Sequence, residues 1–386
     1  MTAKLFTPLE LGNLQLANRI MVSPMCQYSA VDGKMQPWHQ THLATMALSG
    51  AGMLMVEATA VEAAGRITPF CAGLYDDDTE SAMRGVLEHV RALSNMPLGL
   101  QLAHAGRKAS SDAPWNSGKA LAAGDGGWQT VAPSALSHAP GEPTPTELDE
   151  RELVKLKESF RQTTRRACKL GYEVIELHMA HGYLLHQFLS PIANQRTDEY
   201  GGSLENRMRY PLEVFDAVHD EVKTHTKKTG NTQPIPLGVR ISASDWVENG
   251  WDITQSLEFS KQLEQIGCAF IDTSSGGISP KQKINLGPGY QIPFAEKIKH
   301  EVNIPVIAVG LITEPAHAEE IIANNQADAV MLARGFLADP RWPWRAAAQL
   351  KATVDAPPQY WRCMPAEAHN PFSNSRFGTR RCTEPL

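Results

Sequence analysis

The 386-residue chain has few cysteines and none of the short nucleotide-binding motifs. Its six cysteines are scattered without a C-x-x-C pair, which gives no support for a zinc ribbon or an iron–sulfur cluster and favours reduced thiols. The three-glycine dinucleotide fingerprint and the GxxxxGK[ST] phosphate loop are both missing. A nucleotide must therefore be bound in some other way.

Long apolar runs and blocks of like charge are also missing. The longest apolar runs, such as 304–312, are far shorter than the roughly 18 residues of a membrane span, and Met1–Glu10 lacks the basic-then-apolar layout of a secretory signal. Lys and Arg total 36 against 42 for Asp and Glu, giving a net charge of −6. We therefore expect a cytoplasmic protein that binds neither nucleic acid nor membrane.

What the sequence does contain is a repeated alternation of apolar runs and amphipathic stretches. Hydrophobic residues make up 42% of the chain, enough for one large core. Helical patterns lie between short runs typical of buried parallel strands, among them 151–170, 208–223, 253–266 and 315–324. Eight runs predict a (β/α)₈ TIM barrel in one domain, residues 1–364. They are 19–22, 52–58, 98–102, 174–177, 235–241, 270–273, 306–309 and 329–333.

Two segments do not fit the alternation. Ser110–Glu147, rich in Gly, Pro, Ser and Trp, predicts a long loop excursion after the third strand. Such a loop is usually a lid or a binding loop, with a solvent-facing surface loop as the alternative. The polar, aperiodic stretch 365–386 predicts a flexible C-terminal tail.

The residues that follow the strands are polar and reactive, and in such a barrel they share one mouth. Gly310 and Ala333-Arg334-Gly335 follow strands seven and eight, where barrels often hold a phosphate through backbone N–H groups, a helix N-terminus and a fixed positive charge. The alternative is that Gly310 serves only a turn and Arg334 only a surface ion pair.

Histidines and one cysteine add candidate chemistry at the strand ends. His178-x-x-His181-x-Tyr183 offers two hydrogen-bond donors for an oxyanion and a phenol for proton delivery. Zinc binding is the rival hypothesis, weakened because no third ligand follows at matching spacing. His39-x-x-His42 is expected to pack at a helix start, and Cys26 either packs or acts at the exit of strand one.

These residues, in this order, resemble the old yellow enzyme family, in its branch with a cysteine beside the flavin, the YqjM-like or thermophilic-like ene-reductases, close to the xenobiotic reductases. The resemblance spans almost the whole chain. Its most specific segments are Pro24-Met-Cys-Gln-Tyr28, Gln101-Leu-Ala-His-Ala-Gly-Arg-Lys108, His178-Met-Ala-His-Gly-Tyr-Leu184, Phe188-Leu-Ser-Pro and Arg196-Thr-Asp-Glu-Tyr-Gly-Gly-Ser-Leu-Glu-Asn-Arg207.

The resemblance implies an FMN-bearing barrel that reduces alkenes activated by a carbonyl, imide or nitro group, with electrons from NADPH or NADH. Ala333 stands where many relatives have glycine, a change that keeps the backbone N–H donor. The family pattern places Gly310, Ala333 and Arg334 at the phosphate. It places these residues at the isoalloxazine: Pro24, Met25, Cys26, Ala60, Gln101 and Arg240.

The family also implies roles at the substrate. His178 and His181 would hold the substrate oxygen while hydride passes from flavin N5 to the β-carbon, and Tyr183 would deliver a proton to the α-carbon. Tyr28 would line the substrate pocket, and Cys26 would tune the flavin. Arg362 would reach a neighbour's active site in a homodimer or homotetramer, although Cys363-Met364 follows it where some relatives have Gly-Trp.

Two other functions are compatible with a phosphate-binding barrel. A cofactor-free lyase or aldolase would use the phosphate site for its substrate, but no lysine stands at a strand end for a Schiff base. A non-catalytic flavin or phosphate sensor would use Cys26 as a redox switch. The choice between NADPH and NADH stays open.

Overall fold

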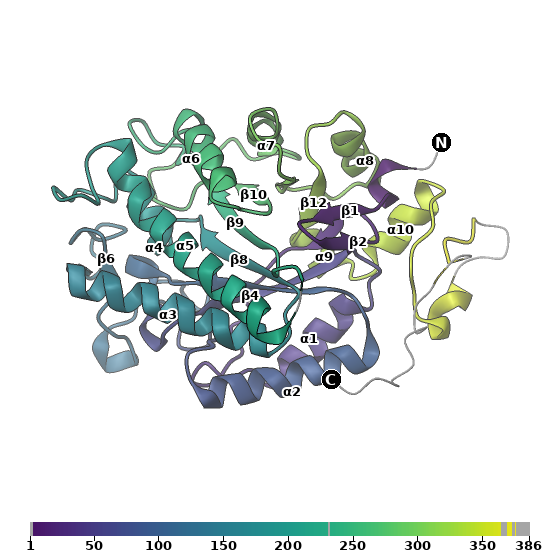
Figure 1. The fold of residues 1–386 in the computed structure, drawn as a ribbon, viewed down its shortest axis with the longest axis horizontal. Coiled ribbons are helices and arrows are strands. Elements are labelled where there is room, and N and C mark those ends of the chain that lie inside the picture. The colour runs from purple at the N-terminus through teal and green to yellow at the C-terminus, as the bar shows by residue number, and fades with distance from the viewer. Residues whose placement is uncertain (1–2, 231, 364–368, 373–374, 376–386) are drawn as a thin grey trace.

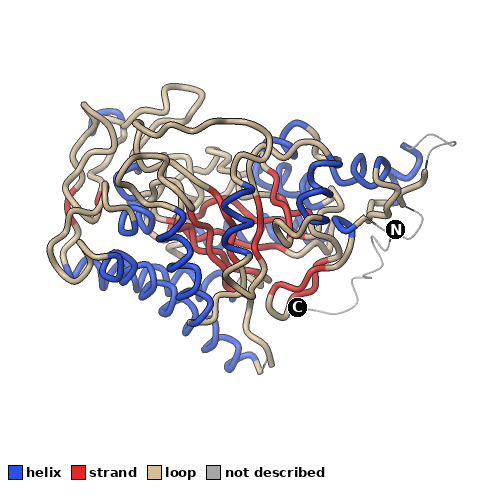
Figure 2. Tube along the Cα trace, turned by 90° about the horizontal axis from the view of Figure 1, so that it is seen from above, coloured by secondary structure: helices blue, strands red, loops and turns tan. Residues whose placement is uncertain are grey.

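Eight parallel strands close into a barrel in the computed structural model, which describes residues 3–230, 232–363, 369–372 and 375 (Figures 1 and 2). Each strand overlaps one of the eight predicted runs, so the predicted barrel is confirmed. The strands are β3 (Ile20–Val22), β4 (Met53–Ala60), β5 (Leu98–Ala103), β8 (Val174–Met179), β9 (Leu237–Ser242), β10 (Ile271–Ser274), β11 (Val306–Ala308) and β12 (Ala329–Leu332). They run in chain order around the barrel, with β12 paired to β3.

Helices cover the outside of the barrel (Figure 1). The helix predicted over 208–223 is longer in the structure, because Ser203 caps its start by accepting from the Asn206 N–H and Gly230 ends it at a φ of +73°. The α-helices are α1 (Pro37–Ala47), α2 (Asp77–Leu93), α3 (Glu150–Lys169), α4 (Leu184–Leu189), α5 (Leu204–Thr229), α6 (Ile253–Gln265), α7 (Ile292–Lys299), α8 (Pro315–Ala323), α9 (Arg334–Ala338) and α10 (Trp342–Gln349).

Short elements complete the described chain. The 3₁₀ helices are η1 (Lys4–Phe6), η2 (Ala63–Gly65), η3 (Gly106–Lys108), η4 (Ala123–Asp125) and η5 (Pro358–Cys363). Two small sheets stand apart from the barrel: the hairpin β1 (Leu9–Leu11) with β2 (Leu14–Leu16), and the parallel pair β6 (Val131–Ala132) with β7 (Thr146–Glu147). None of the helices that the structure describes is long and apolar enough to cross a membrane.

The lower part of the barrel interior is an apolar plug. We use this name for one buried cluster of side chains from the barrel strands and the β1–β2 hairpin: Leu9, Leu11, Leu16, Met21, Met53, Met55, Val174, Phe270, Ile307, Val309, Ala329 and Met331. Room for the Phe270 ring comes from Gly238, where an added Cβ would lie 2.4 Å from that ring. The plug fills the lower end of the barrel as far as the structure describes it, which leaves the opposite, C-terminal end for a ligand.

The excursion between β5 and α3 is fastened to the barrel. Arg107 Nη1 donates to the Leu136 carbonyl at 3.2 Å, and Arg196 Nη1 donates to the Pro133 carbonyl at 3.0 Å. Trp115 stands 67% exposed and meets the Tyr28 ring edge-on, with centroids 5.5 Å apart. The excursion therefore reaches the segment after β3, and its role as a lid or binding loop stays a prediction.

Part of the predicted C-terminal tail packs on the barrel. Phe372 is 3% exposed and lies against Trp344, with ring centroids 5.3 Å apart. The Val354 N–H also donates to the Pro371 carbonyl at 2.8 Å. The prediction of a flexible tail is therefore wrong at 369–372, because the Phe372 ring is buried there. The rest of 365–386, Ser375 apart, lies outside the described residues.

Candidate active site

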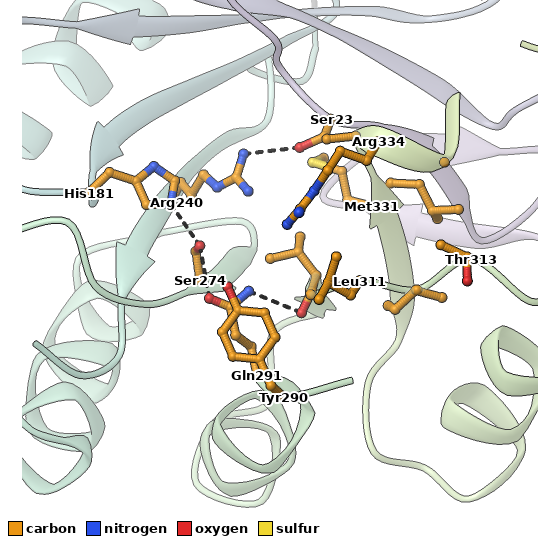
Figure 3. Close-up of a pocket in the computed structure, with 16 residues that line it drawn as sticks. Ser23, His181, Arg240, Ser274, Tyr290, Gln291, Leu311, Thr313, Met331 and Arg334 are labelled. Carbon is orange, nitrogen blue, oxygen red and sulfur yellow. Dashed lines mark hydrogen bonds between the residues drawn. The ribbon is translucent and has the colours of Figure 1, made fainter. Parts of the chain in front are cut away.

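A cavity of about 210 Å³ opens at the C-terminal ends of the strands (Figure 3). Two guanidinium groups border it, Arg240 on β9 and Arg334 at the start of α9, just beyond β12 (Figure 3). The other lining residues are Ser23, His181, Ser274, Tyr290, Gln291, Val309, Gly310, Leu311, Ile312, Thr313, Met331, Leu332, Ala333 and Gly335. Four predicted cofactor residues, Arg240, Gly310, Ala333 and Arg334, thus meet at one cavity.

The backbone at the predicted phosphate end takes special conformations at two neighbouring residues, Gly310 and Leu311, the second with a left-handed φ of +54°. Gly310 has a φ of +130°, and a Cβ added there would lie 3.2 Å from the Gln291 side chain, so only glycine fits without displacement. Ala333 has a φ of −104°, which alanine adopts freely, so its departure from the family's glycine introduces no strain. The Arg334 side chain is exposed and carries the positive charge that a phosphate needs.

Arg240 is the buried counterpart of Arg334. It is 7% exposed, its Nη1 donates to Ser23 Oγ at 3.1 Å, and its Nε lies 3.1 Å from Asp272 Oδ2. The strand register explains this contact, because Arg240 and Asp272 are direct partners of β9 and β10. Two partners fix the guanidinium at the cavity wall.

The fixed guanidinium and the phosphate end together fit FMN. A cation held at the cavity wall suits the electronegative edge of a flavin ring. An exposed cation beside a glycine backbone suits the phosphate at the other end of the same molecule.

His178 and His181 point at one another. His178 Nε2 lies 3.3 Å from His181 Nδ1, and the ring planes stand 89° apart. The Ala180 N–H donates to His178 Nδ1 at 3.3 Å, so the His178 proton sits on Nε2 and is donated to His181. The His181 proton then sits on Nε2 and is donated to Ser274 Oγ at 2.7 Å.

Both rings are neutral near neutral pH. Burial lowers the pKa of each well below its usual value, and Arg240 and Lys108 lower it further. Among the residues that the structure describes, no third His, Cys, Asp or Glu joins these two histidines in a group that could hold a metal ion. The geometry therefore favours hydrogen-bond donation over the zinc hypothesis.

Lys108 fastens the loop that carries His181. Its Nζ donates to the carbonyls of His181 at 2.8 Å and Gly277 at 2.9 Å, and it lies 5.0 Å from the centre of the Tyr183 ring. His181 has a left-handed φ of +58°, so this loop needs such support. Burial lowers the pKa of Lys108 to about 8. Sequence reasoning quoted Lys108 only as the end of a motif and gave it no role.

Tyr183 and the residues after β3 form the other side of the site. The Tyr183 ring packs edge-on against His178, with centroids 5.0 Å apart. Burial raises the pKa of Tyr183 well above 10, and the nearby Cys26 and Tyr28 raise it further. Pro24 and Met25 lie in the same segment, partly exposed like Cys26. The structure thus brings together Cys26, Tyr28, His178 and Tyr183, as predicted.

The Cys26 thiol has a neighbour that the sequence did not reveal. A hydrogen bond to Cys71 is the largest cause that raises the pKa of Cys26 well above 9, followed by burial. The same bond lowers the pKa of Cys71, whose sulfur also contacts Thr68 Oγ1 at 3.3 Å. Cys26 is therefore a neutral thiol near pH 7. The two cysteines are 45 positions apart, and only the barrel brings their loops together.

The remaining predicted residues have mixed outcomes. Ala60 ends β4 and Gln101 lies within β5, 3% and 2% exposed, at the predicted strand positions. His39 packs at the start of α1, where its Nδ1 accepts from the Gln36 N–H at 2.9 Å, which confirms its structural role. Arg362 is exposed in η5 and does not line the cavity of its own chain.

Sequence reasoning missed two polar residues of the β10–α7 connection. Gln291 lines the cavity and accepts from Ser275 Oγ at 2.6 Å, and Tyr290 precedes it. Their segment shows neither a strand nor a helix period, so no pattern marked it. The sequence analysis also gave no role to Ser274 at the end of β10, which proves to be the partner of His181.

Comparison with known proteins agrees with this site. The model of the NADH:flavin oxidoreductase / NADH oxidase family matches residues 4–353. The NADPH dehydrogenases of Bacillus velezensis and Bacillus subtilis are 42% and 41% identical to the chain, each over 94% of it and 99% of the relative. The solved structure of morphinone reductase in complex with tetrahydroNAD has a TM-score of 0.72 at 29% identity, covering 92% of this chain and 93% of that one.

The barrel, the cavity and these relatives define an NAD(P)H-dependent flavin oxidoreductase that uses FMN. The chain belongs to the NADH:flavin oxidoreductase / NADH oxidase family, the old yellow enzyme family that the sequence motifs indicated. A cofactor-free lyase and a non-catalytic sensor are thereby set aside.

Proposed function

We propose that this flavin reductase acts on alkenes activated by a carbonyl, imide or nitro group. The observation that carries the proposal is the neutral histidine pair beside the FMN cavity, with Tyr183 packed against it. Bound FMN supplies a hydride, taken from NAD(P)H, to the β-carbon of the alkene. The chain's own residues bind the substrate oxygen, hold the cofactor and deliver the proton.

His181 is the principal donor to the substrate oxygen. Its Nε2 proton faces Ser274 Oγ on the cavity wall, and a carbonyl or nitro oxygen takes the place of that hydroxyl as acceptor. His178 keeps His181 in the required tautomer by donating to its Nδ1. A neutral N–H at a buried site stabilises developing negative charge on this oxygen without a prior charge of its own.

Tyr183 delivers the proton to the α-carbon. Its raised pKa keeps the phenol protonated, as a donor must be, and makes it a weak acid that gives up its proton only to a strongly basic carbon. Lys108 above the ring favours the phenolate at the moment of transfer. Arg240 and Arg334 border the cavity and hold the flavin ring and the phosphate. The family pattern adds Pro24, Met25, Ala60 and Gln101 against the ring.

We also propose that Arg362 lies at an interface between two copies of the chain. It is exposed in η5 together with Tyr360 and Trp361, which are 43% and 42% exposed. These side chains are suited to the active site of a second copy, as in a homodimer or homotetramer. Measuring the molar mass in solution for the wild type and for Arg362→Ala tests whether this segment belongs to an interface.

An anaerobic half-reaction experiment tests the activity. NADPH should bleach the yellow enzyme, and 2-cyclohexenone should restore the colour with formation of cyclohexanone. A reduced enzyme that no activated alkene re-oxidises, or a preparation that releases no FMN on denaturation, refutes the proposal. Running the same test with NADH decides which coenzyme is preferred.

Tyr183→Phe separates the two half-reactions. The variant keeps the ring and its packing against His178, so flavin reduction by NADPH should stay near the wild-type rate. Alkene-driven re-oxidation should slow by roughly 10²-fold, the lower range for general acid catalysis. Equal slowing of both halves would indicate disturbed packing, and a wild-type rate would mean that water delivers the proton.

A further inference from the structure

Two carboxyl groups lie behind Arg240, inside the barrel. Glu176 on β8 and Asp272 on β10 are both 0% exposed. Gln101 Nε2 donates to Glu176 Oε1 at 2.7 Å, and Arg240 Nε lies 3.1 Å from Asp272 Oδ2. Glu176 shares the inward face of β8 with Val174 of the apolar plug, because side chains alternate along a strand. The acid pair therefore sits between the plug and the cavity.

The charges of this cluster do not balance if both acids are ionised. Two carboxylates would face one guanidinium, and Gln101 contributes no charge. Among the described residues, Glu176 Oε2 and both Asp272 carboxyl oxygens have no hydrogen-bond partner, and Arg240 meets Asp272 only as an ion pair. An unpaired buried carboxylate is costly, so a retained proton is the cheaper state.

The groups around the two acids also favour a retained proton. Burial is the largest cause that raises the pKa of each acid, and Asp272 raises that of Glu176 further. Arg240 acts in the opposite direction on both. The other titratable groups nearby are the Cys268 thiol, whose pKa burial raises to about 12, and His178, which is neutral. Neither of these two supplies a counter-charge near neutral pH.

We propose that the Glu176–Asp272 pair takes up a proton from solvent when the flavin is reduced and releases it when the flavin is re-oxidised. The inference rests on the proposed place of Arg240 at the flavin ring. Reduction adds negative charge beside Arg240, which is also the ion-pair partner of Asp272. Two anions then share one guanidinium, and the pair binds a proton more tightly.

The step balances in electrons and protons. NAD(P)H passes a hydride, two electrons and one proton, to the flavin and leaves as NAD(P)⁺, so the flavin gains one negative charge without a solvent proton. The carboxylate pair gains one proton from solvent and forms one O–H bond. Re-oxidation by the substrate reverses the uptake. Each proton linked to a two-electron couple steepens the potential by about 30 mV per pH unit.

Proton uptake can be measured directly. The holoenzyme, weakly buffered and anaerobic, is reduced with one equivalent of NADPH in the presence of a pH indicator, at several pH values near and above 8. Burial already raises the pKa of Glu176 to about 8, so the oxidised enzyme has a vacant proton site only in this range. We expect uptake of a substantial fraction of one proton per FMN. Wild-type enzyme that reduces its flavin with no uptake overturns the proposal.

Variants assign the proton to the pair rather than to the flavin itself. Glu176→Gln keeps the shape and the contact with Gln101, and it should abolish most of the uptake and flatten the pH dependence of the midpoint potential. The matched control is Glu221→Gln, a carboxyl 2% exposed but paired with Arg165 at 2.8 Å outside the barrel. The control should behave like the wild type.

Two outcomes decide against the proposal at this stage. Uptake unchanged in Glu176→Gln and in the second variant, Asp272→Asn, assigns the proton to the flavin. Loss of uptake in Glu221→Gln makes the effect unspecific. The test uses only the reductive half, so an enzyme that fails to reduce any alkene would refute the proposed function and leave this measurement valid.

Discussion

The lower and upper parts of the barrel interior are built from the same strands but differ in chemistry. Phe270, directly before β10, fills the apolar plug, whereas Asp272 and Ser274 on the same face of β10 bind Arg240 and His181. On β8, Val174 below gives way to Glu176 and His178 above. A parallel strand changes role within a few residues, from packing to chemistry.

This difference separates stability from reactivity. Apolar side chains in the plug gain from being removed from water, by about 25 cal/mol per Å². The polar side chains above lose hydration and recover it only through specific partners such as Ser274 and Asp272. The plug should therefore determine the stability of the barrel, and the polar layer above it should determine ligand binding and activity. The predictions below test this division.

The largest effect is expected from Phe270→Ala. The ring is 0% exposed and occupies the space opposite Gly238, so its removal leaves a cavity that the barrel cannot close. We expect a loss of about 3–5 kcal/mol in the free energy of unfolding. Denaturant unfolding of the FMN-free protein measures it. The variant that folds and binds FMN should keep the wild-type midpoint potential. A large change in that potential would show that the apolar plug and the polar layer above it are coupled.

His178→Ala tests the upper layer in the same way. It is preferred to His181→Ala because His181 has a φ of +58°, where any change also alters the backbone. Loss of the donor to His181 should weaken binding of phenolic ligands by roughly 1–3 kcal/mol and slow the oxidative half-reaction to match. FMN should stay bound. Phenol affinity equal to the wild type would show that His178 does not support oxygen binding by His181.

Lys108→Met tests the charge held in this layer. The pKa of Lys108 is lowered from 10.5 to about 8, so between these values the unfolded chain holds a proton that the folded chain has lost. The contribution of Lys108 therefore makes the wild type more stable as the pH rises through this range, by up to about 1.4 kcal/mol per pH unit. Lys108→Met should lack this slope. Parallel stability curves for the two proteins between pH 8 and 10.5 would contradict the assignment.

The two parts also differ in how far the sequence could predict them. Apolar runs gave all eight strands and the single barrel, because burial on both faces leaves a continuous hydrophobic pattern. The positions of His178, His181, Tyr183 and Arg240 followed from their places at strand ends. Glu176 and Asp272 stood inside predicted strands, a charge in an apolar run, and this signal was not used.

The contacts that the sequence could not give are those between distant loops. Lys108 meets the His181 and Gly277 carbonyls, and Gln291 reaches the cavity from a segment with no period. Such contacts depend on the path of each loop after the strand ends, which no local pattern encodes. Packing of Phe372 on Trp344 was missed for the same reason, because one aromatic residue in a polar stretch is too weak a signal.

The smallest effect is expected at Cys26, on the border of the upper layer. Its raised pKa keeps the thiol neutral, so beside the flavin, where the family pattern places it, Cys26 would act as a weak dipole and not as a charge. Cys26→Ser should leave FMN stoichiometry intact and shift the midpoint potential by up to about 30 mV, equivalent to about 1.4 kcal/mol for a two-electron couple.

Cys168→Ser in α3 is the matched control, a buried cysteine of the helical layer, 3% exposed. It should lower thermal stability and leave the potential unchanged. Potentiometric titration of both variants separates tuning from packing, and a Cys26→Ser potential identical to the wild type would make Cys26 a packing residue.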